Sequence, residues 1–279
     1  RGQRPGRIGP QEIVDHYVRK RPCRRVVRVL VFREPGQPAD VIDEFHVLDD
    51  AMSRRAPPAL YLPWPGQAQS GMAERLMVHP VNPQQRLVDK AVAVIRGGGL
   101  ALVPTDAGYS LAWGLEAREA EERVQRLREL DSRHPFTLLC RQLSEAGRLA
   151  RLDDRAFRLM RSLTPGPCTF ILPASPDLPK RIKNAGRSKR RDIGIRLPDH
   201  GVIRMVLESV GEPLLSTSLV LPDEEHPNSH EAEQVAERWL RWVDVMLDAE
   251  DCEPGPTSIV DCTGDEPEVI RQGFHPVAL

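Results

Sequence analysis

The stretch LALVPTDAGYSLAWG, residues 100–114, decides the fold of this chain. It predicts an apolar strand that ends in the tripeptide PTD at 104–106, a small turn at 107–108, and a second apolar run that begins with Tyr109. Short apolar runs that are bounded by turn residues are typical of buried strands. Polar groups so close to the end of a buried strand form either a turn or a functional site.

Helical and strand patterns alternate on both sides of this stretch. Before it, apolar residues recur at helical spacing from Asn82, the expected N-cap, and Pro83, the expected first helical residue, to the glycines at 97–99. The patterns that follow predict helices over 116–130, 154–163, 201–211 and 230–243. They also predict strands over 136–140, 191–199 and 212–222, a turn into a strand over 164–173, and three short C-terminal strands. We therefore expect an α/β fold, a twisted mixed parallel/antiparallel sheet with helices on its faces.

Residues 1–76 differ in composition from the rest of the chain. They are rich in Pro and Arg, and they contain one β-branched run, RRVVRVLVF at 24–32, that predicts a strand. The remaining sequence is typical of turns and polyproline-like segments, with too little apolar surface for an independent core. We expect a loosely ordered N-terminal extension over 1–76 and a domain over 77–279.

Composition and overall charge do not by themselves favour a charged partner. The chain has 279 residues and a net charge of −1, so its overall charge favours neither nucleic acid nor a membrane. No apolar run approaches the length that crosses a bilayer, and the first residues lack the pattern of a secretory signal. The five cysteines are scattered without a C-x-x-C pair, which predicts packing thiols, no metal site and a cytoplasmic location.

Hydroxyl residues lie beside Pro or Gly at several strand ends. Thr105 follows Pro104, Thr169 follows the turn TPGPC, and Thr217 and Ser218 lie within STSL. Arg196 closes the strand DIGIR just before a proline. Short hydroxyls, exposed backbone N–H groups and an arginine are the groups that hold phosphates and carboxylates. Each residue alone is typical of a turn or a satisfied sheet position, but their repetition predicts one binding site.

The segment PKRIKNAGRSKRRD, residues 179–192, concentrates positive charge. Only Asp192 opposes its basic residues, which are Lys180, Arg181, Lys183, Arg187, Lys189, Arg190 and Arg191. One interpretation is a solvated loop. The other is a rim that binds the phosphates of a nucleotide or of RNA. Because the segment has no aromatic residue, contacts would be with phosphates and not through base stacking.

Familiar catalytic motifs are missing from the sequence. It contains no G-x-G-x-x-G, Walker A, G-x-S-x-G or H-E-x-x-H pattern. His200, next to Asp199, is expected to begin a helix and not to act as a base.

Four motifs resemble, in order and spacing, those of the YrdC/Sua5 family, the threonylcarbamoyl-AMP synthases. They are VPTDAGYSL, TPGPCTFIL, IGIRLPDH and PLLSTSLVLP, and the resemblance covers about residues 78–273. It implies a YrdC-like sheet with a concave basic cavity. The family makes threonylcarbamoyl-adenylate from threonine, bicarbonate and ATP, on the way to the N6-threonylcarbamoyl (t6A) modification of tRNA adenosine.

The resemblance also implies a set of substrate- and nucleotide-binding residues and no covalent nucleophile. The set is Thr105, Tyr109, Arg128, Thr169, Arg196, Thr217 and Ser218. Thr105 would contact the threonine or carbamoyl part, whereas Thr169 and Ser218 would contact the nucleotide and its phosphates. ATP is the expected substrate, with Mg²⁺, and catalysis would rest on positioning and charge stabilisation.

Two signatures of the family are altered in this chain. In its K-x-R signature, Arg128 stands in place of the Lys and Leu130 in place of the Arg. In its S-A-N signature, Val220 stands in place of the Asn. Arg does not replace Lys equivalently at a phosphate, and each lost hydrogen bond removes about 1–3 kcal/mol.

The full pattern resembles the YciO-like branch of the family. For this branch we expect binding of ATP or threonylcarbamoyl-adenylate, with weak or altered nucleotidyltransferase activity of the L-threonylcarbamoyladenylate synthase type. The alternative is a non-catalytic protein that binds double-stranded RNA such as tRNA or rRNA.

Overall fold

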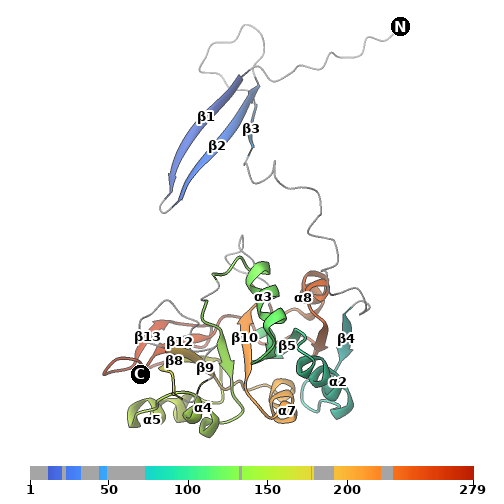
Figure 1. The fold of residues 1–279 in the computed structure, drawn as a ribbon, viewed down its shortest axis with the longest axis vertical. Coiled ribbons are helices and arrows are strands. Elements are labelled where there is room, and N and C mark those ends of the chain that lie inside the picture. The colour runs from blue at the N-terminus through green and yellow to red at the C-terminus, as the bar shows by residue number, and fades with distance from the viewer. Residues whose placement is uncertain are drawn as a thin grey trace. The chain divides into compact units, whose positions relative to one another are not determined.

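The chain divides into two compact units, Arg1–Ser70 and Gly71–Leu279. A computed structural model describes the backbone of three strands in the first unit and, in the second, residues 73–131, 134–176, 178, 192–220 and 229–279 (Figure 1). In the first unit, β1 (Glu12–Lys20), β2 (Cys23–Phe32) and β3 (Glu44–Leu48) form an antiparallel sheet in the order β1-β2-β3. The strand expected over 24–32 is therefore confirmed, whereas its two neighbours were not predicted.

The second unit is built on one ten-stranded sheet, in the order β13-β12-β8-β9-β7-β10-β6-β5-β11-β4. Its strands are β4 (Glu74–Met77), β5 (Ala101–Thr105), β6 (Gly108–Gly114), β7 (Thr137–Leu139), β8 (Cys168–Pro173), β9 (Asp192–Arg196), β10 (Leu214–Ser218), β11 (Val245–Asp248), β12 (Ser258–Asp261) and β13 (Glu268–Arg271). The pairs β4–β11, β11–β5, β7–β9 and β8–β12 are parallel, and the other pairs are antiparallel. The expected mixed sheet is confirmed.

Helices cover both faces of this sheet. They are α2 (Gln85–Arg96), α3 (Arg118–Leu127), α4 (Leu143–Leu149), α5 (Asp154–Leu163), α7 (Gly201–Val210) and α8 (Ala232–Trp239), which continues into a 3₁₀ turn at Leu240–Trp242. Alternate residues of β5 show the two faces, because Leu102 packs with residues of α3, α5 and α8, whereas Ala101 and Val103 pack with residues of α2 and α7. We call these the α3/α8 face and the α2/α7 face; α2 and α7 lie side by side on theirs (Figure 1).

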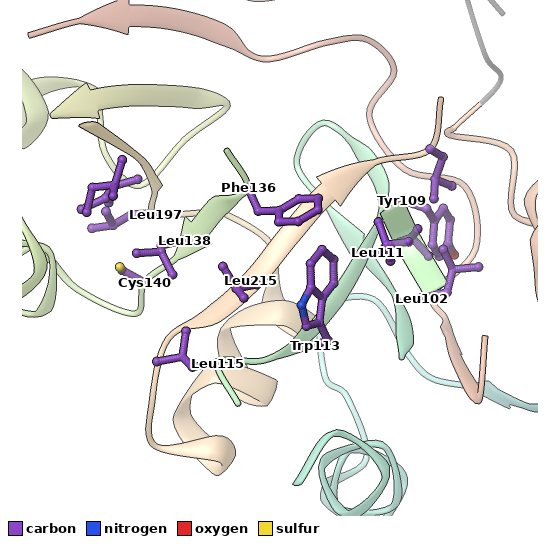
Figure 2. Packing of buried hydrophobic residues seen from close by; sticks show 14 of the residues in the cluster. Leu102, Tyr109, Leu111, Trp113, Leu115, Phe136, Leu138, Cys140, Leu197 and Leu215 are labelled. Atoms are coloured by element: carbon purple, nitrogen blue, oxygen red, sulfur yellow. The ribbon is translucent and has the colours of Figure 1, made fainter. Parts of the chain in front are cut away.

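Aromatic packing stabilises the α3/α8 face at the centre of the sheet. Trp113 of β6 meets the ring of Phe136 edge to face, with centroids 4.9 Å apart and an interplanar angle of 85° (Figure 2). Such a pair contributes about 0.5–1.5 kcal/mol beyond the area it buries. Leu138 of β7 and Leu215 of β10 are buried in the same cluster. This packing holds β6, β7 and β10 together, and these strands carry much of the candidate site.

Helix α2 begins at Gln85, so the start expected at residues 82–83 is wrong. The cause is His79, whose Nδ1 accepts hydrogen bonds from the N–H groups of Val81 and Asn82 at 3.2 and 3.1 Å. These bonds close a turn ahead of the helix. Asn82 therefore caps nothing, although its residue type and position favoured that role.

Other boundaries agree with the sequence to different degrees. The helices expected over 154–163 and 201–211 are confirmed, whereas α3 and α8 are shorter than expected and α4 was not predicted. The second unit begins at Gly71 and contains β4, so the expected domain boundary at 76/77 falls inside a strand. The strand sequence ERLM is too short to show a clear alternation.

The described cysteines are packing thiols, as expected. Cys140, Cys168 and Cys252 are buried, Cys262 is half-buried, and all four are free. Burial raises the pKa of Cys168 to about 11 and that of Cys252 to about 12. No helix in the described part of the chain is long and apolar enough to cross a bilayer. The described residues also contain no group of three or more His, Cys, Asp or Glu side chains placed to hold a metal ion.

Candidate functional site

The sheet register shows on which face each predicted site residue lies. Directly paired residues of neighbouring strands point to the same face, and successive residues of one strand alternate. Thr169 of β8 pairs with Arg196 of β9, which pairs with Leu139 of β7. Leu139 packs with α2 and α7 residues. Thr169 and Arg196 therefore lie together on the α2/α7 face.

Ser218 lies on the same face. It pairs with Ser110 of β6, which pairs with Val103 of β5, a residue that packs with α2 and α7. Thr137 of β7 pairs with Ser216 of β10, two residues from Ser218, and so belongs to this face as well. The register thus brings together three of the predicted site residues from strands that are distant in sequence.

We call this surface the hydroxyl face. It is formed by Ser110, Thr137, Thr169, Ser216 and Ser218, with Arg196 among them. Sequence reasoning missed Ser110, Thr137 and Ser216. The alternation in STS, which places Ser216 beside Ser218, could have indicated one of them. A run of hydroxyl side chains around one arginine can donate several hydrogen bonds to an anion or a sugar.

Arg196 and Asp106 form a buried ion pair at this face. Arg196 is 5% exposed, and its Nη2 donates to Asp106 Oδ1 and, at 3.2 Å, to Thr105 Oγ1. Within the described part of the chain, neither Arg196 Nε nor Asp106 Oδ2 has a hydrogen-bond partner. A buried polar atom without a partner costs about 1–3 kcal/mol, so two adjacent ones mark a place where a bound group could complete the bonding.

Thr105 organises the turn between β5 and β6. Its hydroxyl donates to the carbonyl of Gly108 at 2.6 Å and accepts from the N–H of Ala107 at 3.1 Å and from Arg196. Gly108 has φ +77°, and a Cβ there would come within 2.6 Å of the carbonyl oxygen of Ser229, so this turn requires glycine. Thr105 is fully buried and orients Arg196, so the PTD segment is both a turn and part of the site.

Tyr109 is not brought to the hydroxyl face. It follows Gly108 on β6 and points to the α3/α8 face, where it is 1% exposed. Its hydroxyl donates to the carbonyl of Glu250 at 2.7 Å and accepts from the N–H of Ala249 at 3.1 Å. Burial raises the pKa of this hydroxyl above its usual value. Tyr109 therefore anchors β6 to the segment after β11.

Arg128 and Thr217 also lie on the α3/α8 face. Thr217 pairs with Leu111, which packs in that cluster. Arg128 is the C-cap of α3; its Nη1 donates to Thr217 Oγ1 and its Nε donates to the carbonyl of Val220 at 2.8 Å. Burial lowers the pKa of the guanidinium. Leu130 packs against the same apolar cluster. The altered signature positions therefore meet behind β10, away from Arg196.

A second arginine, Arg271 of β13, lies in the same line of cross-strand pairs as Thr169. It was not predicted from the sequence. Arg271 pairs with Ile259, which pairs with Thr169. Its guanidinium donates to the carbonyl of Thr257 at 2.8 and 3.1 Å and to Thr257 Oγ1 at 3.1 Å. Thr169 Oγ1 lies 3.3 Å from the same hydroxyl. Three strand spacings of about 4.8 Å separate Arg271 from Arg196.

His200 begins α7, as expected. It is the N-cap residue, and its Nδ1 accepts from the N–H of Val202 at 3.3 Å. Burial lowers the pKa of His200, while the charges of Asp106 and Asp199 oppose that shift. The predicted basic rim, residues 180–191, lies outside the described residues, and the basic cavity remains a prediction with it.

Comparison with known proteins places the chain among a defined set of relatives. The family model Sua5_yciO_yrdC, described as telomere recombination, matches residues 93–273. YciO of Escherichia coli K12, described as uncharacterized, is 42% identical over 206 residues, which cover 74% of this chain and 98% of YciO. A threonylcarbamoyl-AMP synthase of Stenotrophomonas maltophilia is 31% identical over 166 residues, which cover 58% and 86% of the two chains.

Solved structures show the same fold. The crystal structure of E. coli YciO superimposes with a TM-score of 0.67 at 40% identity and covers 73% of this chain and 97% of its own. The structure of P. abyssi Sua5 complexed with L-threonine superimposes with a TM-score of 0.63 at 21% identity, over 71% of this chain and 57% of its own. The second likeness concerns the fold alone.

Proposed function

The chain belongs to the Sua5/YciO/YrdC family, and from this premise we propose that it binds ATP or threonylcarbamoyl-adenylate on the hydroxyl face. We propose weak or altered L-threonylcarbamoyladenylate synthase activity, linked to the t6A modification of tRNA. The support comes from relatives named threonylcarbamoyl-AMP synthase. The observation that carries the proposal is the buried Arg196–Asp106 pair with one unpartnered atom on each side chain.

The two unpartnered atoms define the chemistry of the group they would bind. Arg196 Nε is a hydrogen-bond donor, and Asp106 Oδ2, as a carboxylate oxygen, is an acceptor. A ligand that meets both must present an acceptor beside a donor. The C=O and N–H of a carbamoyl group do so, whereas a bare phosphate presents acceptors only and would meet the Asp106 charge. We therefore propose that the carbamoyl part lies at Arg196–Asp106.

The phosphates are proposed to lie toward β8, β12 and β13. There Thr169, Thr257 and the Arg271 guanidinium lie in one connected group, and the contacts of Arg271 to Thr257 are all to neutral oxygens. An exposed guanidinium whose hydrogen-bond partners are all neutral oxygens can still pair with an anion. Mg²⁺ prefers oxygen ligands in octahedral geometry, and Asp106 is one carboxylate at this face, so phosphate oxygens and water would supply most of its ligands.

The reaction requires positioning more than proton transfer by the protein. Threonine's amine takes up CO₂ with loss of a proton, one carbamate oxygen attacks the α-phosphorus of ATP, and pyrophosphate leaves. Effective alignment and charge stabilisation supply most of such an acceleration. Because Leu130 packs into the apolar cluster and Arg128 is held behind β10, two groups of the signature are missing from the reaction face. This supports weak or altered activity.

Parallel titrations with ATP, AMP and threonylcarbamoyl-adenylate test the proposal. We expect all three to bind the wild-type chain. The Arg196→Gln variant should bind threonylcarbamoyl-adenylate at least about tenfold more weakly, since a charge-assisted hydrogen bond contributes about 1.5–3 kcal/mol, and should bind ATP and AMP with smaller losses because they lack the carbamoyl group. Ser218→Ala should weaken binding by a smaller factor. Ser162→Ala is the matched control, because its hydroxyl bonds within α5 to the carbonyl of Leu159. Pyrophosphate release with threonine and ATP reports on synthase activity.

The same titration, extended to tRNA, distinguishes nucleotide binding from the second candidate function, RNA binding. The basic residues at 180–191 favour RNA as an alternative ligand, which would bind with a steep dependence on salt. Binding of tRNA without binding of any of the three nucleotides would contradict the nucleotide proposal and support the RNA-binding one. Equal affinities of wild-type and Arg196→Gln chains for threonylcarbamoyl-adenylate would also contradict it.

A further inference from the structure

We infer that Arg128 is a positioning residue that fixes the segment Thr217–Val220 from the α3/α8 face and so presents Ser218 on the opposite, hydroxyl face. The inference concerns the site of the proposed function, and its ligand-binding arm rests on that function. It gives Arg128 a role different from the direct substrate or nucleotide contact that the family resemblance implied for it and for Thr217.

The geometry of the segment supports this role. β10 ends at Ser218, Leu219 is fully buried, and the N–H of Val220 donates to the carbonyl of Ser218 at 3.1 Å. The Arg128 guanidinium contacts the residue before Ser218, through Thr217 Oγ1, and the residue two after it, through the carbonyl of Val220 at 2.8 Å. Arg128 thus holds both ends of the short turn that carries Ser218.

The two contacts also explain why arginine suits this position. A guanidinium has five N–H donors in a rigid plane and can bridge two acceptors, whereas a lysine ammonium is a point charge on a flexible stem. Both acceptors are neutral, and within the described part of the chain no acidic side chain pairs with Arg128. Burial lowers its pKa because no carboxylate offsets the desolvation.

The alternation along β10 separates Arg128 from the ligand. Ser216 and Ser218 point to the hydroxyl face, and Thr217, to which Arg128 is bonded, points the other way. A ligand that contacts Ser218 therefore lies on the other side of the strand from the guanidinium. Arg128 would act on such a ligand through the backbone of residues 217–220 and not by direct contact.

Hydrogen–deuterium exchange of the ligand-free protein tests the positioning directly. In Arg128→Ala and in Thr217→Val, we expect amide exchange in residues 214–220 to accelerate at least about tenfold, since each change releases one side of the contact. Arg128→Lys should restore part of the protection because it keeps one donor. Arg126→Ala is the matched control, since it removes the same charge from an exposed position of the same helix. Unchanged exchange in Arg128→Ala would overturn the inference.

The affinities of the variants for AMP and ATP provide a second test of the inference. If Arg128 is a positioning residue, Arg128→Ala should weaken the binding of AMP and of ATP by the same factor, and Thr217→Val should have a similar effect. In the double variant the two effects should not add, because both changes break the same contact. A loss that grows from AMP to ATP would show direct phosphate contact and overturn the inference. If the wild-type chain binds neither nucleotide, the proposed function fails, while the exchange experiment still tests the role of Arg128.

Discussion

At the residue scale, the Arg196–Asp106 pair is the feature on which the proposed function rests. Withdrawing both charges from water is costly, and their mutual attraction offsets this cost only when the remaining hydrogen-bonding atoms are satisfied. Here one atom of each side chain is left without a partner in the described structure. An incompletely bonded buried pair is a poor stabilising device. Its presence among hydroxyl residues is better explained by binding, since a ligand would satisfy both atoms.

His200 provides a prediction at this scale. Its Nδ1 caps α7 only when that nitrogen is unprotonated, and burial lowers its pKa in the folded state. The unfolded chain, with a histidine pKa of about 6.5, therefore binds the proton more readily. The stability that His200 contributes is complete above that pH and is lost as the pH falls toward the folded-state pKa. We expect the free energy of unfolding, measured in urea, to fall between pH 8 and pH 5.5.

The control is His200→Asn, which keeps a capping acceptor that does not titrate. This variant should be about as stable as the wild type at pH 8 and should lose less stability on acidification. His200→Ala should cost about 1 kcal/mol at pH 8, the usual cost of a lost N-cap. Asp106 and Asp199 are the neighbouring acids that oppose the shift. Identical pH profiles for wild type and His200→Asn would refute the linkage.

The site residues that were predicted from the sequence are marked by their local sequence, whereas those that were missed are placed by long-range strand pairing. Thr169, Arg196 and Ser218 were found because a hydroxyl or an arginine beside a turn residue is visible in the local sequence. Thr137 and Arg271 were missed because their place depends on register with strands far away in the chain. No local pattern carries that information.

At the element scale, β4 shows how a short edge strand is held in the sheet. It pairs with β11 and is held by ion pairs of different burial, which join Arg75 to Asp248 and Glu233, and Glu74 to Lys90. The Arg75 guanidinium lies 2.6 Å from Asp248 Oδ2, whose side chain is 1% exposed. Lys90 lies 2.5 Å from Glu74, and both side chains of that pair are exposed. The buried Arg75–Asp248 pair and the exposed Lys90–Glu74 pair allow a direct comparison on a single strand.

Removing Arg75 should be far more costly than removing Lys90. Arg75→Met leaves the buried Asp248 carboxylate with the Tyr109 hydroxyl and the N–H of Glu250 but without a cation, so we expect a loss of about 2 kcal/mol or more. Lys90→Met breaks an exposed pair and should cost less than about 1 kcal/mol. Urea unfolding of both variants measures the difference. Equal losses would mean that β4 is held by its backbone and by Leu76, without help from the buried pair.

The same scale shows which elements could be predicted. Helices α5 and α7 have strong apolar periodicity, and the sequence predicts their limits well. Helix α4 has seven residues and β4 has four, too few to establish a period. The start of α2 was wrong because the side chain of His79, not the local propensity of Asn82, decides where the chain turns.

At the scale of the whole molecule, the division of the chain follows the sheet and not the composition. The Pro- and Arg-rich sequence continues to about residue 76, yet the second unit begins at Gly71 because β4 belongs to its sheet. A composition boundary reports which residues favour a packed core, whereas a structural boundary reports which residues are paired. The two boundaries differ at β4 because this strand has more exposed than buried residues, so its composition does not mark it as part of the packed unit.

Truncation tests this boundary. A chain of residues 71–279 retains β4, whereas a chain of residues 78–279 loses the strand, the buried side chain of Leu76 and the Arg75 partner of Asp248. Loss of a buried leucine costs about 2–5 kcal/mol, and the orphaned carboxylate adds to this, so the shorter chain should be less stable by at least about 4 kcal/mol. Urea unfolding of the two chains, monitored by tryptophan fluorescence, measures the gap. If both chains unfold at the same urea concentration, β4 is dispensable and the second unit begins where the composition changes.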